Sequence, residues 1–364
     1  MVNSKTAALL TGASGYLGGS LLVHLIRKFE IETRNVKLYT LVRKPEQVSQ
    51  VHELGGDVTV LIGDVMDAEG MKKLIIDNSI SIVIETVDAR LFTVAQPCIE
   101  ALAVVKEKLS VPVHFVHTSG AKMHSSQVGI DQSGFLNDDG DVYNTLARVD
   151  TQHPVMKKFV RVNNEIIDYA ESKGVRSYIV APPMVYGPGK GFGNKISIQN
   201  AALVRVARAL GQLYQIDTTD TIWALMHIDD QCALYATVLA GVLDLKAPYG
   251  KDGFYFSENG TFSWRQLSLA LLNALRKRNS LDAVDKLPVA TEGDLVAMSQ
   301  VLRCDVGMVP LSFAGNCLIR GNNARKLGWT PQYGVEHLMS SAEEEVAFII
   351  KEDKVFAFPG AKLP

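Results

Sequence analysis

This sequence has few cysteines, no excess of one charge and no long apolar run. Only four of its 364 residues are cysteine and none forms a CxxC pair, which disfavours a disulfide framework and a structural zinc site. The 37 Lys and Arg residues balance 39 Asp and Glu residues, without a basic block that would bind nucleic acid or a membrane surface. No stretch approaches the roughly 18 apolar residues of a membrane-spanning helix, and the N-terminal residues do not fit a signal peptide.

These absences predict a cytoplasmic, enzyme-sized protein that binds neither nucleic acid nor membrane. Hydrophobic residues make up 47% of the chain and charged residues 21%, which excludes wholesale disorder. The length suits one large domain or two interlocked ones. His117, His124 and His153 lack the spacing and the accompanying carboxylates of a recognised ligand set, so we expect no metal.

A glycine-rich turn lies near the N-terminus. The apolar run at residues 6–11 predicts a buried strand, and leucines at four-residue intervals from Leu17 predict a helix. Between them stand Gly12, Gly15 and Gly18. Glycine at a strand-to-helix turn lets a pyrophosphate approach the free N–H groups of the helix N-terminus, so the segment predicts a dinucleotide site. A glycine-rich turn without a ligand is the alternative.

Further strands and helices alternate along the first half of the chain. This alternation predicts an α/β fold, a Rossmann doubly wound parallel sheet with right-handed crossovers. A helix is expected over residues 95–108. The expected strands cover residues 36–42, 57–62, 80–85 and 113–117.

The end of the second strand indicates which dinucleotide binds. An acidic residue there would accept hydrogen bonds from the ribose of NAD, but the strand ends in Arg43 and Lys44. Two cations suit the 2′-phosphate of NADP, so NADP is predicted and NAD is less favoured. A solvated basic strand end is the alternative.

On these motifs the sequence resembles the extended short-chain dehydrogenase/reductase family, of the NAD-dependent epimerase/dehydratase type. The resemblance extends over most of the chain and keeps the family's order of elements. The matching segments are residues 11–18 (TGASGYLG), 63–67 (GDVMD), 118–120 (TSG), 181–189 (APPMVYGPG), 227–230 (HIDD) and 327–331 (LGWTP).

The resemblance implies an architecture and a set of cofactor contacts. An NADP-binding Rossmann domain would cover residues 1–187 and be re-entered near 222–245. A smaller, interleaved and discontinuous substrate lobe would take most of residues 188–364. Asp64 and Val65 would flank the adenine, and Pro182, Pro183 and Met184 would lie near the nicotinamide. The cofactor contacts expected in total are Thr11, Gly12, Ser14, Gly15, Tyr16, Leu17, Gly18, Arg43, Lys44, Asp64, Val65, Thr118, Pro182 and Met184.

The family's catalytic residues are missing or displaced. The family uses a Ser or Thr after the fifth strand and a Tyr-x-x-x-Lys pair on a helix, with a glutamate four residues later. A helix expected over residues 155–172 offers Glu165 as that glutamate. The lysine then falls on Arg161 and the tyrosine on Lys157, while the serine position falls beside Ser119.

Several groups could replace the missing pair. Arg161 stays protonated and could bind an oxyanion, whereas Lys157 could donate a proton if desolvation lowered its pKa. Both could instead lie on a solvated face. Tyr143 is the nearest upstream tyrosine, in a segment expected to be a loop.

Lys122 offers another route, just beyond the fifth strand and facing the cofactor crevice. Its setting resembles the progesterone 5β-reductase/iridoid synthase branch of the family, whose lysine helps enone reduction. A surface lysine is the alternative. The catalytic candidates are therefore Lys122, Lys157, Arg161, Tyr143 and Ser119.

The substrate side is less defined. The loop at residues 190–199 is expected to fold over a substrate. Nearby cations keep a sugar nucleotide open as a substrate. The amino-acid sequence of the segments around residues 185–199 also resembles a fungal subgroup of the family, many of whose members accompany secondary metabolism. The cations are Lys190, Lys195, Arg205 and Arg208.

Three functions remain open from the sequence. The first is an NADP(H)-dependent oxidoreductase acting on a small, largely apolar carbonyl or enone metabolite. The second is a non-redox isomerase or cyclase, or a sugar-nucleotide epimerase, on the same fold. The third is an NADP-sensing binding protein. A small-molecule substrate is the expected partner, and a homodimer is an open alternative.

Overall fold

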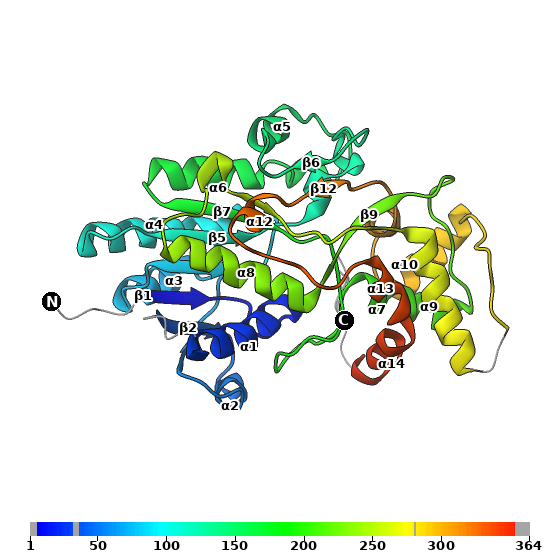
Figure 1. Cartoon of the computed structure of the whole chain (residues 1–364), viewed down its shortest axis with the longest axis horizontal. Coiled ribbons are helices and arrows are strands. Elements are labelled where there is room, and N and C mark those ends of the chain that lie inside the picture. The colour runs from blue at the N-terminus through cyan, green and yellow to red at the C-terminus, as the bar shows by residue number, and fades with distance from the viewer. Residues whose placement is uncertain (1–5, 32–35, 280–281, 354–364) are drawn as a thin grey trace.

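A seven-stranded parallel sheet forms the centre of the protein (Figure 1). The computed structural model describes residues 6–31, 36–279 and 282–353. Every neighbouring pair of strands runs parallel, in the order β10-β7-β5-β4-β1-β2-β3. The strands are β1 (Thr6–Leu10), β2 (Val36–Val42), β3 (Val58–Ile62), β4 (Ile82–Glu85), β5 (His114–Thr118), β7 (Arg176–Ala181) and β10 (Phe254–Phe256).

Helices cover both faces of this sheet and bury one apolar core on each side. One core contains residues of α1 (Tyr16–Ile31) and α8 (Ile228–Leu243). The other contains residues of α3 (Ala68–Asp77), α4 (Phe92–Leu109) and α6 (Val162–Ser172). The predicted doubly wound parallel sheet is therefore confirmed, because strands buried on both faces were already visible as short apolar runs.

A second layer of structure lies at one end of the large sheet. Its sheet has the order β11-β9-β8, with β8 (Met184–Tyr186) parallel and β11 (Thr261–Ser263) antiparallel to β9 (Ile222–His227). The domain boundary at residue 187 stays a prediction. The surrounding helices are α7 (Gln199–Leu210), α9 (Trp264–Arg278), α10 (Glu292–Leu302), α11 (Met308–Phe313), α13 (Val335–Ser340) and α14 (Ala342–Glu352).

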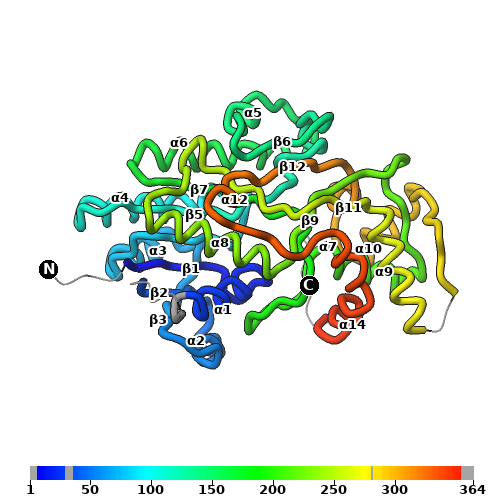
Figure 2. The backbone as a smooth tube through the Cα atoms, in the orientation of Figure 1, coloured from blue at the N-terminus to red at the C-terminus, as the bar shows by residue number. Residues whose placement is uncertain are grey.

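Short elements complete the chain. Figure 2 shows the segment with β12 and α12 running from the smaller lobe to the large sheet and back. These elements are α2 (Glu46–His52), β6 (Leu136–Asn137), α5 (Val142–Arg148), β12 (Ile319–Arg320), α12 (Asn323–Lys326) and the 3-10 turns η1 (Ala121–His124), η2 (Ser126–Val128), η3 (Met156–Lys158) and η4 (Gly250–Asp252).

The expected helix over residues 155–172 was wrong in its first half. Residues 156–158 form the 3-10 turn η3, and α6 begins only at Val162. Lys157, Lys158 and Arg161 place three cations within one and a half turns, which disfavours a continuous helix. Lys157 and Arg161 therefore do not share a helical face.

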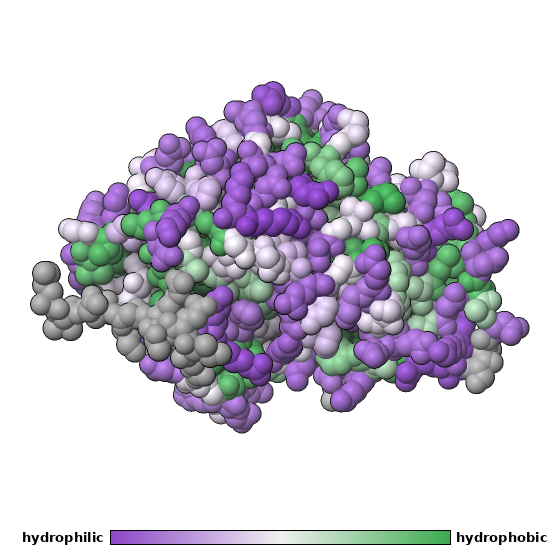
Figure 3. Space-filling view, in the orientation of Figure 1, coloured by the Kyte–Doolittle hydropathy of each residue, from purple (hydrophilic) through white to green (hydrophobic). Residues whose placement is uncertain are grey.

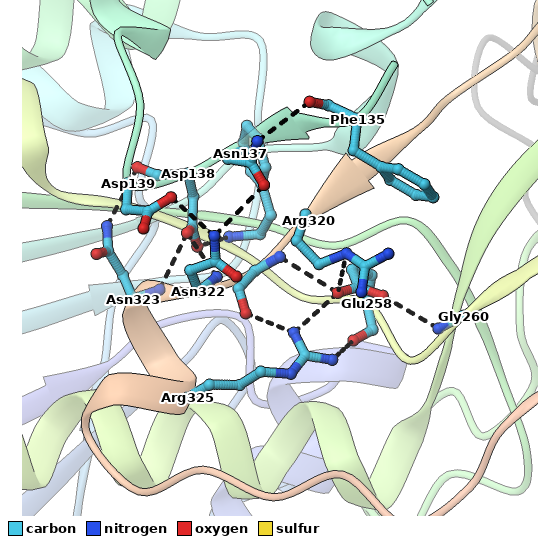
Figure 4. Close-up of polar contacts among 12 residues, drawn as sticks. Phe135, Asn137, Asp138, Asp139, Glu258, Gly260, Arg320, Asn322, Asn323 and Arg325 are labelled. Atoms are coloured by element: carbon cyan, nitrogen blue, oxygen red, sulfur yellow. Dashed lines mark hydrogen bonds and ion pairs between the residues drawn. The ribbon is translucent and has the colours of Figure 1, made fainter.

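A buried carboxylate fastens the β12–α12 segment to the turn after β10 (Figure 4). Glu258 is 2% exposed and accepts hydrogen bonds from the backbone N–H groups of Gly260 and Gly321. Its Oε1 also lies 2.8 Å from the Arg325 guanidinium. Since charge-assisted bonds are stronger when water is excluded, this network holds the β12–α12 segment firmly against the turn after β10.

His124 makes the stability of the fold sensitive to acid. Its ring is fully buried beside Phe254 and Phe256, and burial lowers its pKa to about 3. Within the described residues neither ring nitrogen has a partner. A histidine of the unfolded chain titrates near pH 6.5. The stability contributed by the neutral ring is therefore complete above that pH and is lost as the pH falls from about 6.5 towards 3.

We expect His124→Leu to lose less stability in acid than the parent. Between pH 7.5 and pH 5, the free energy of unfolding of the variant should improve by about 2 kcal/mol relative to the parent. Urea unfolding at both pH values measures this difference. His52→Leu, at an exposed position on α2, is the control and should follow the parent. The same pH dependence in His124→Leu and the parent would contradict the assignment.

The surface gives no sign of a membrane-spanning element. Figure 3 shows apolar and polar side chains intermixed over the face in view. Within residues 6–31, 36–279 and 282–353, none of the helices has the length and apolarity needed to cross a bilayer.

Candidate functional site

Two neighbouring cavities open along the carboxyl ends of the central strands. The first, here called the nucleotide cavity, has a volume of about 290 Å³. It extends from the end of β1 over the ends of β2, β3 and β4. Its lining residues are Gly12, Ala13, Ser14, Gly15, Leu41, Val42, Arg43, Asp64, Val65, Met66, Thr86, Val87, Asp88, Leu91 and Val94.

The glycine-rich turn forms the floor of the nucleotide cavity. Gly12 has a φ of +79°, which an L side chain rarely adopts, and a Cβ there would clash with the Thr86 hydroxyl. A Cβ on Gly18 would clash with the carbonyl of Gly12. The Thr86 hydroxyl in turn donates to the Thr11 carbonyl over 2.7 Å. The turn therefore packs too closely for side chains, as it must if a pyrophosphate is to approach the N-terminus of α1.

Of the two cations predicted to bind the 2′-phosphate, only one lines the far end of the nucleotide cavity. Arg43 lines the cavity together with Asp64 and Val65. Among the described residues, the Arg43 guanidinium has no hydrogen-bond or ion-pair partner. Lys44 is absent from the lining, is largely exposed and lies 3.9 Å from a Glu46 carboxylate oxygen.

The second cavity, here called the lysine cavity, has a volume of about 230 Å³. Tyr16 and Leu17, the next two residues of the same turn, line it. Of its described lining residues only Lys122 carries a charge. The lining consists of Tyr16, Leu17, Thr118, Ser119, Gly120, Ala121, Lys122, Pro182, Pro183, Val185, Ile198, Gln199 and Trp223.

Lys122 is held at the wall of the lysine cavity by two contacts. Its Nζ donates a hydrogen bond to the Leu311 carbonyl of α11 and lies 5.7 Å from the centroid of the Trp223 ring. Burial lowers the pKa of Lys122 to about 7, because no carboxylate offsets the cost of desolvating the ammonium. The amine can therefore donate a proton near neutral pH.

Thr118 and Tyr235 form a second polar pair at this cavity. The Thr118 and Tyr235 hydroxyl oxygens lie 2.6 Å apart, and Tyr235 is fully buried on α8. Burial raises the pKa of Tyr235, so its phenol stays protonated. Either hydroxyl can donate in this bond; when Tyr235 donates, the Thr118 proton stays available for a second hydrogen bond. Ser119 lines the same cavity, and its hydroxyl donates to the Met123 sulfur over 3.5 Å.

The other catalytic candidates lie elsewhere. Lys157 and Arg161 are exposed and line neither cavity. Tyr143 does not lie in a loop as expected, because Asp141 caps a short helix, α5. Its hydroxyl donates to Asp168 over 2.6 Å, which raises the pKa of Tyr143 to about 12.

Thr11 and Met184 also lie apart from the lining. Both are buried, at the end of β1 and in β8. Tyr235 is a candidate residue that the sequence did not suggest. It lies 117 residues beyond Thr118, and no local pattern marks a hydroxyl pair of that separation.

The loop at residues 190–199 packs against the glycine-rich turn. The Asn194 N–H donates to the Ser14 carbonyl over 2.9 Å, and a Cβ on Gly193 would clash with that carbonyl. Lys190 pairs with Asp229 over 2.5 Å, and Arg205 pairs with Asp353. The loop therefore lies over the turn. Neither Lys190 nor Arg205 lines the lysine cavity.

Comparison with known proteins agrees with this geometry. The model of the 3-beta hydroxysteroid dehydrogenase/isomerase family matches residues 9–100, which contain the glycine-rich turn. The chain is 22% identical to the oxidase ucsJ of Acremonium sp over 340 residues, 88% of this chain and 91% of the relative.

Solved structures with the same fold include two nucleotide-sugar enzymes. A dTDP-glucose 4,6-dehydratase from Bacillus anthracis, in complex with NAD, is 12% identical, with a TM-score of 0.63 over 96% of this chain and 98% of that one. A UDP-glucose 4-epimerase from Bifidobacterium longum, in complex with NAD+ and UDP, is 15% identical, with a TM-score of 0.63 over 96% of this chain and 100% of that one. The resemblance seen in the motifs is confirmed: the chain has the fold of the extended short-chain dehydrogenases/reductases of the epimerase/dehydratase type.

Proposed function

We propose that this protein is an NADP(H)-dependent oxidoreductase that reduces a small, largely apolar carbonyl or enone metabolite. The observation that carries the proposal is the course of the glycine-rich turn. Its residues 12–15 line the nucleotide cavity and its residues 16–17 line the lysine cavity. One extended ligand that crosses the turn therefore reaches both cavities, as a dinucleotide does in this fold.

The described residues fit a nicotinamide dinucleotide. Asp64 and Val65 would flank the adenine, Arg43 would pair with a 2′-phosphate, and the turn would receive the pyrophosphate. Bound NADPH supplies a hydride. The Thr118 hydroxyl would donate a hydrogen bond to the substrate carbonyl oxygen, and the Lys122 ammonium would supply the proton that this oxygen takes up.

A sugar nucleotide fits the lysine cavity less well. Its diphosphate needs cations, yet Lys190 and Arg205 are paired elsewhere and most of the cavity wall is apolar. Trp223, Ile198 and the two prolines favour a compact apolar substrate, in keeping with secondary metabolism.

The direct test is NADPH consumption. Purified protein is mixed with NADPH and a panel of aldehydes, ketones and enones, and absorbance at the nicotinamide band is followed. The proposal predicts turnover of at least one apolar member, with product confirmed by mass spectrometry. Tight NADPH binding without turnover of any member would favour the NADP-sensing protein, and conversion without NADPH consumption would favour a non-redox enzyme.

Arg43 should decide between NADP and NAD. We expect Arg43→Ser to weaken NADPH binding by about 10-fold to 100-fold and to leave NADH binding nearly unchanged, because only NADPH carries the phosphate that this cation would bind. Lys44→Ser is the matched control and should change either affinity by less than about 3-fold. Titration calorimetry with both nucleotides measures this. Equal losses for NADPH and NADH in Arg43→Ser would argue against a 2′-phosphate contact.

The Thr118–Tyr235 pair gives a test by a double-mutant cycle. If Tyr235 acts by orienting the Thr118 proton, Tyr235→Phe should lower kcat by about 10-fold while KM changes little. In the Thr118→Val background the same change should then have almost no further effect. Thr118→Ser keeps the hydroxyl and should retain most of the activity. Independent, multiplying losses in the double variant would show that Tyr235 does not act through Thr118.

A further inference from the structure

Proton donation is one reaction available to Lys122, and nucleophilic attack by its neutral amine is another. A lysine amine in an apolar, partly dry cavity has its neutral form favoured, and the neutral amine is a nucleophile. Most of the described residues that line the lysine cavity are apolar, and none of them is a carboxylate.

The contacts of the amine leave it able to attack. Lys122 Nζ donates one hydrogen to the Leu311 carbonyl, and that acceptor does not engage the nitrogen lone pair. The Trp223 ring lies beside the nitrogen, 5.7 Å from it to the ring centroid. The aliphatic part of an aldehyde could lie on Ile198 and Pro183 while its carbonyl meets Nζ and the Thr118 hydroxyl.

We propose that Lys122 captures aldehydes and enones covalently, as a reversible imine formed inside the lysine cavity. The amine lone pair attacks the carbonyl carbon, so a C–N bond forms as the C=O π bond breaks, and the oxygen takes up the proton that the nitrogen loses. The carbinolamine then loses water as the nitrogen forms the C=N bond. No oxidant or reductant is consumed.

For an enone, such an imine would take the place of proton donation by Lys122 to the carbonyl oxygen. When protonated it is more electrophilic than the parent carbonyl, so an enone would accept a hydride at its β carbon more readily. Hydride addition there gives an enamine, which takes up a proton from water at its α carbon to form the saturated iminium. Hydrolysis of that iminium returns the free lysine and a saturated carbonyl product. This inference rests on the proposed carbonyl substrate class, but the capture step needs no nucleotide.

Reductive trapping tests the capture step directly. The full chain is incubated without nucleotide at pH 7.5 with limiting hexanal and sodium cyanoborohydride, which converts an imine into a stable secondary amine. Peptide mass mapping then gives the rate of alkylation at each lysine. We expect Lys122 to be alkylated at least about 10-fold faster than the exposed Lys158 of the same molecules, because a larger fraction of its amine is neutral.

Lys122→Arg should remove the fast phase of labelling and leave the slow phase. Circular dichroism checks that the Lys122→Arg variant folds. The comparison of Lys122 with Lys158 is made in the parent protein, so it holds even if the variant does not fold. Labelling of Lys122 no faster than of Lys158 would overturn the inference. Fast labelling without any NADPH turnover would uphold the inference and remove the proposed reductase activity, so the two failures are distinguishable.

Discussion

Replacement of Lys122 by methionine is expected to lower kcat/KM for NADPH-dependent carbonyl reduction by about 10²-fold to 10³-fold. Methionine is unbranched like lysine, only one atom shorter, and packs in an apolar wall, but it can neither donate a proton nor form an imine. The loss should appear mainly in kcat, since the apolar walls that bind the substrate remain. Steady-state kinetics with the best member of the carbonyl panel measures it.

Two variants test whether the proton donor is Lys122 in the cavity or the residue at the family's tyrosine position. Lys157→Met changes the residue that occupies the family's tyrosine position, and Lys158→Met changes its exposed neighbour. Because neither side chain lines a cavity, we expect both to keep activity within about 2-fold of the parent. A loss in Lys157→Met as large as that in Lys122→Met would return the proton donor to the family's position and would contradict the role given to Lys122.

The pH profile of kcat/KM gives a second test of Lys122 as the proton donor. If the Lys122 ammonium is the proton donor, kcat/KM should be highest below about pH 7 and fall about tenfold per unit above it. The Cys317 thiol is the ionisable group that acts on the amine, and Tyr16, which also lines the cavity, donates its phenol proton to the Gly187 carbonyl. Burial raises the pKa of both, so neither should titrate near pH 7. A profile that is flat from pH 6 to pH 8 would exclude Lys122 as the donor.

Glu258→Gln is expected to lower the free energy of unfolding by about 3 kcal/mol. Glu258 is almost fully buried, and its carboxylate accepts hydrogen bonds from the Arg325 guanidinium and from two backbone N–H groups. The amide keeps the shape of the side chain but leaves the Arg325 charge without its anion. Urea unfolding at pH 7.5 measures the loss, with the midpoint and the slope both recorded.

Arg320→Gln is the matched control for this variant. Arg320 lies 3.8 Å from the same carboxylate, but its side chain is 45% exposed, so solvent screens the pair. We expect a loss of less than about 1 kcal/mol. Equal losses in Glu258→Gln and Arg320→Gln would show that the Arg325 pair contributes no more than a surface contact.

Much of the fold could be predicted because its signals are local. Buried parallel strands appear as short apolar runs, and a helix that packs on them repeats leucine every four residues, as it does from Leu17. The glycine-rich turn could be found for the same reason, since Gly12 and Gly18 are fixed by contacts within a few residues and with Thr86. The helix was wrongly extended to residues before Val162, because the apolar pattern continues there while like charges close together in the chain disfavour a helix.

The site was only partly predictable. The sequence placed Lys122 and Ser119 near the end of β5, but it also left Lys157 and Arg161 as candidates, with Tyr143 as a fallback. Which side chain faces a cavity depends on how distant elements pack, and that information is not local. Tyr235 could not be predicted from the sequence, because its contact with Thr118 requires α8 to pack beneath the end of β5.

The sequence by itself determined the parallel sheet and the glycine-rich turn between its first strand and helix. Each of these follows from residues close together in the chain, where periodicity and spacing carry the physics. Only the tertiary structure decided that, among the described residues that line this largely apolar cavity, Lys122 alone is charged and that it contacts α11 and Trp223. The depression of its pKa comes from burial, and burial is produced by the packing of segments far apart in the sequence.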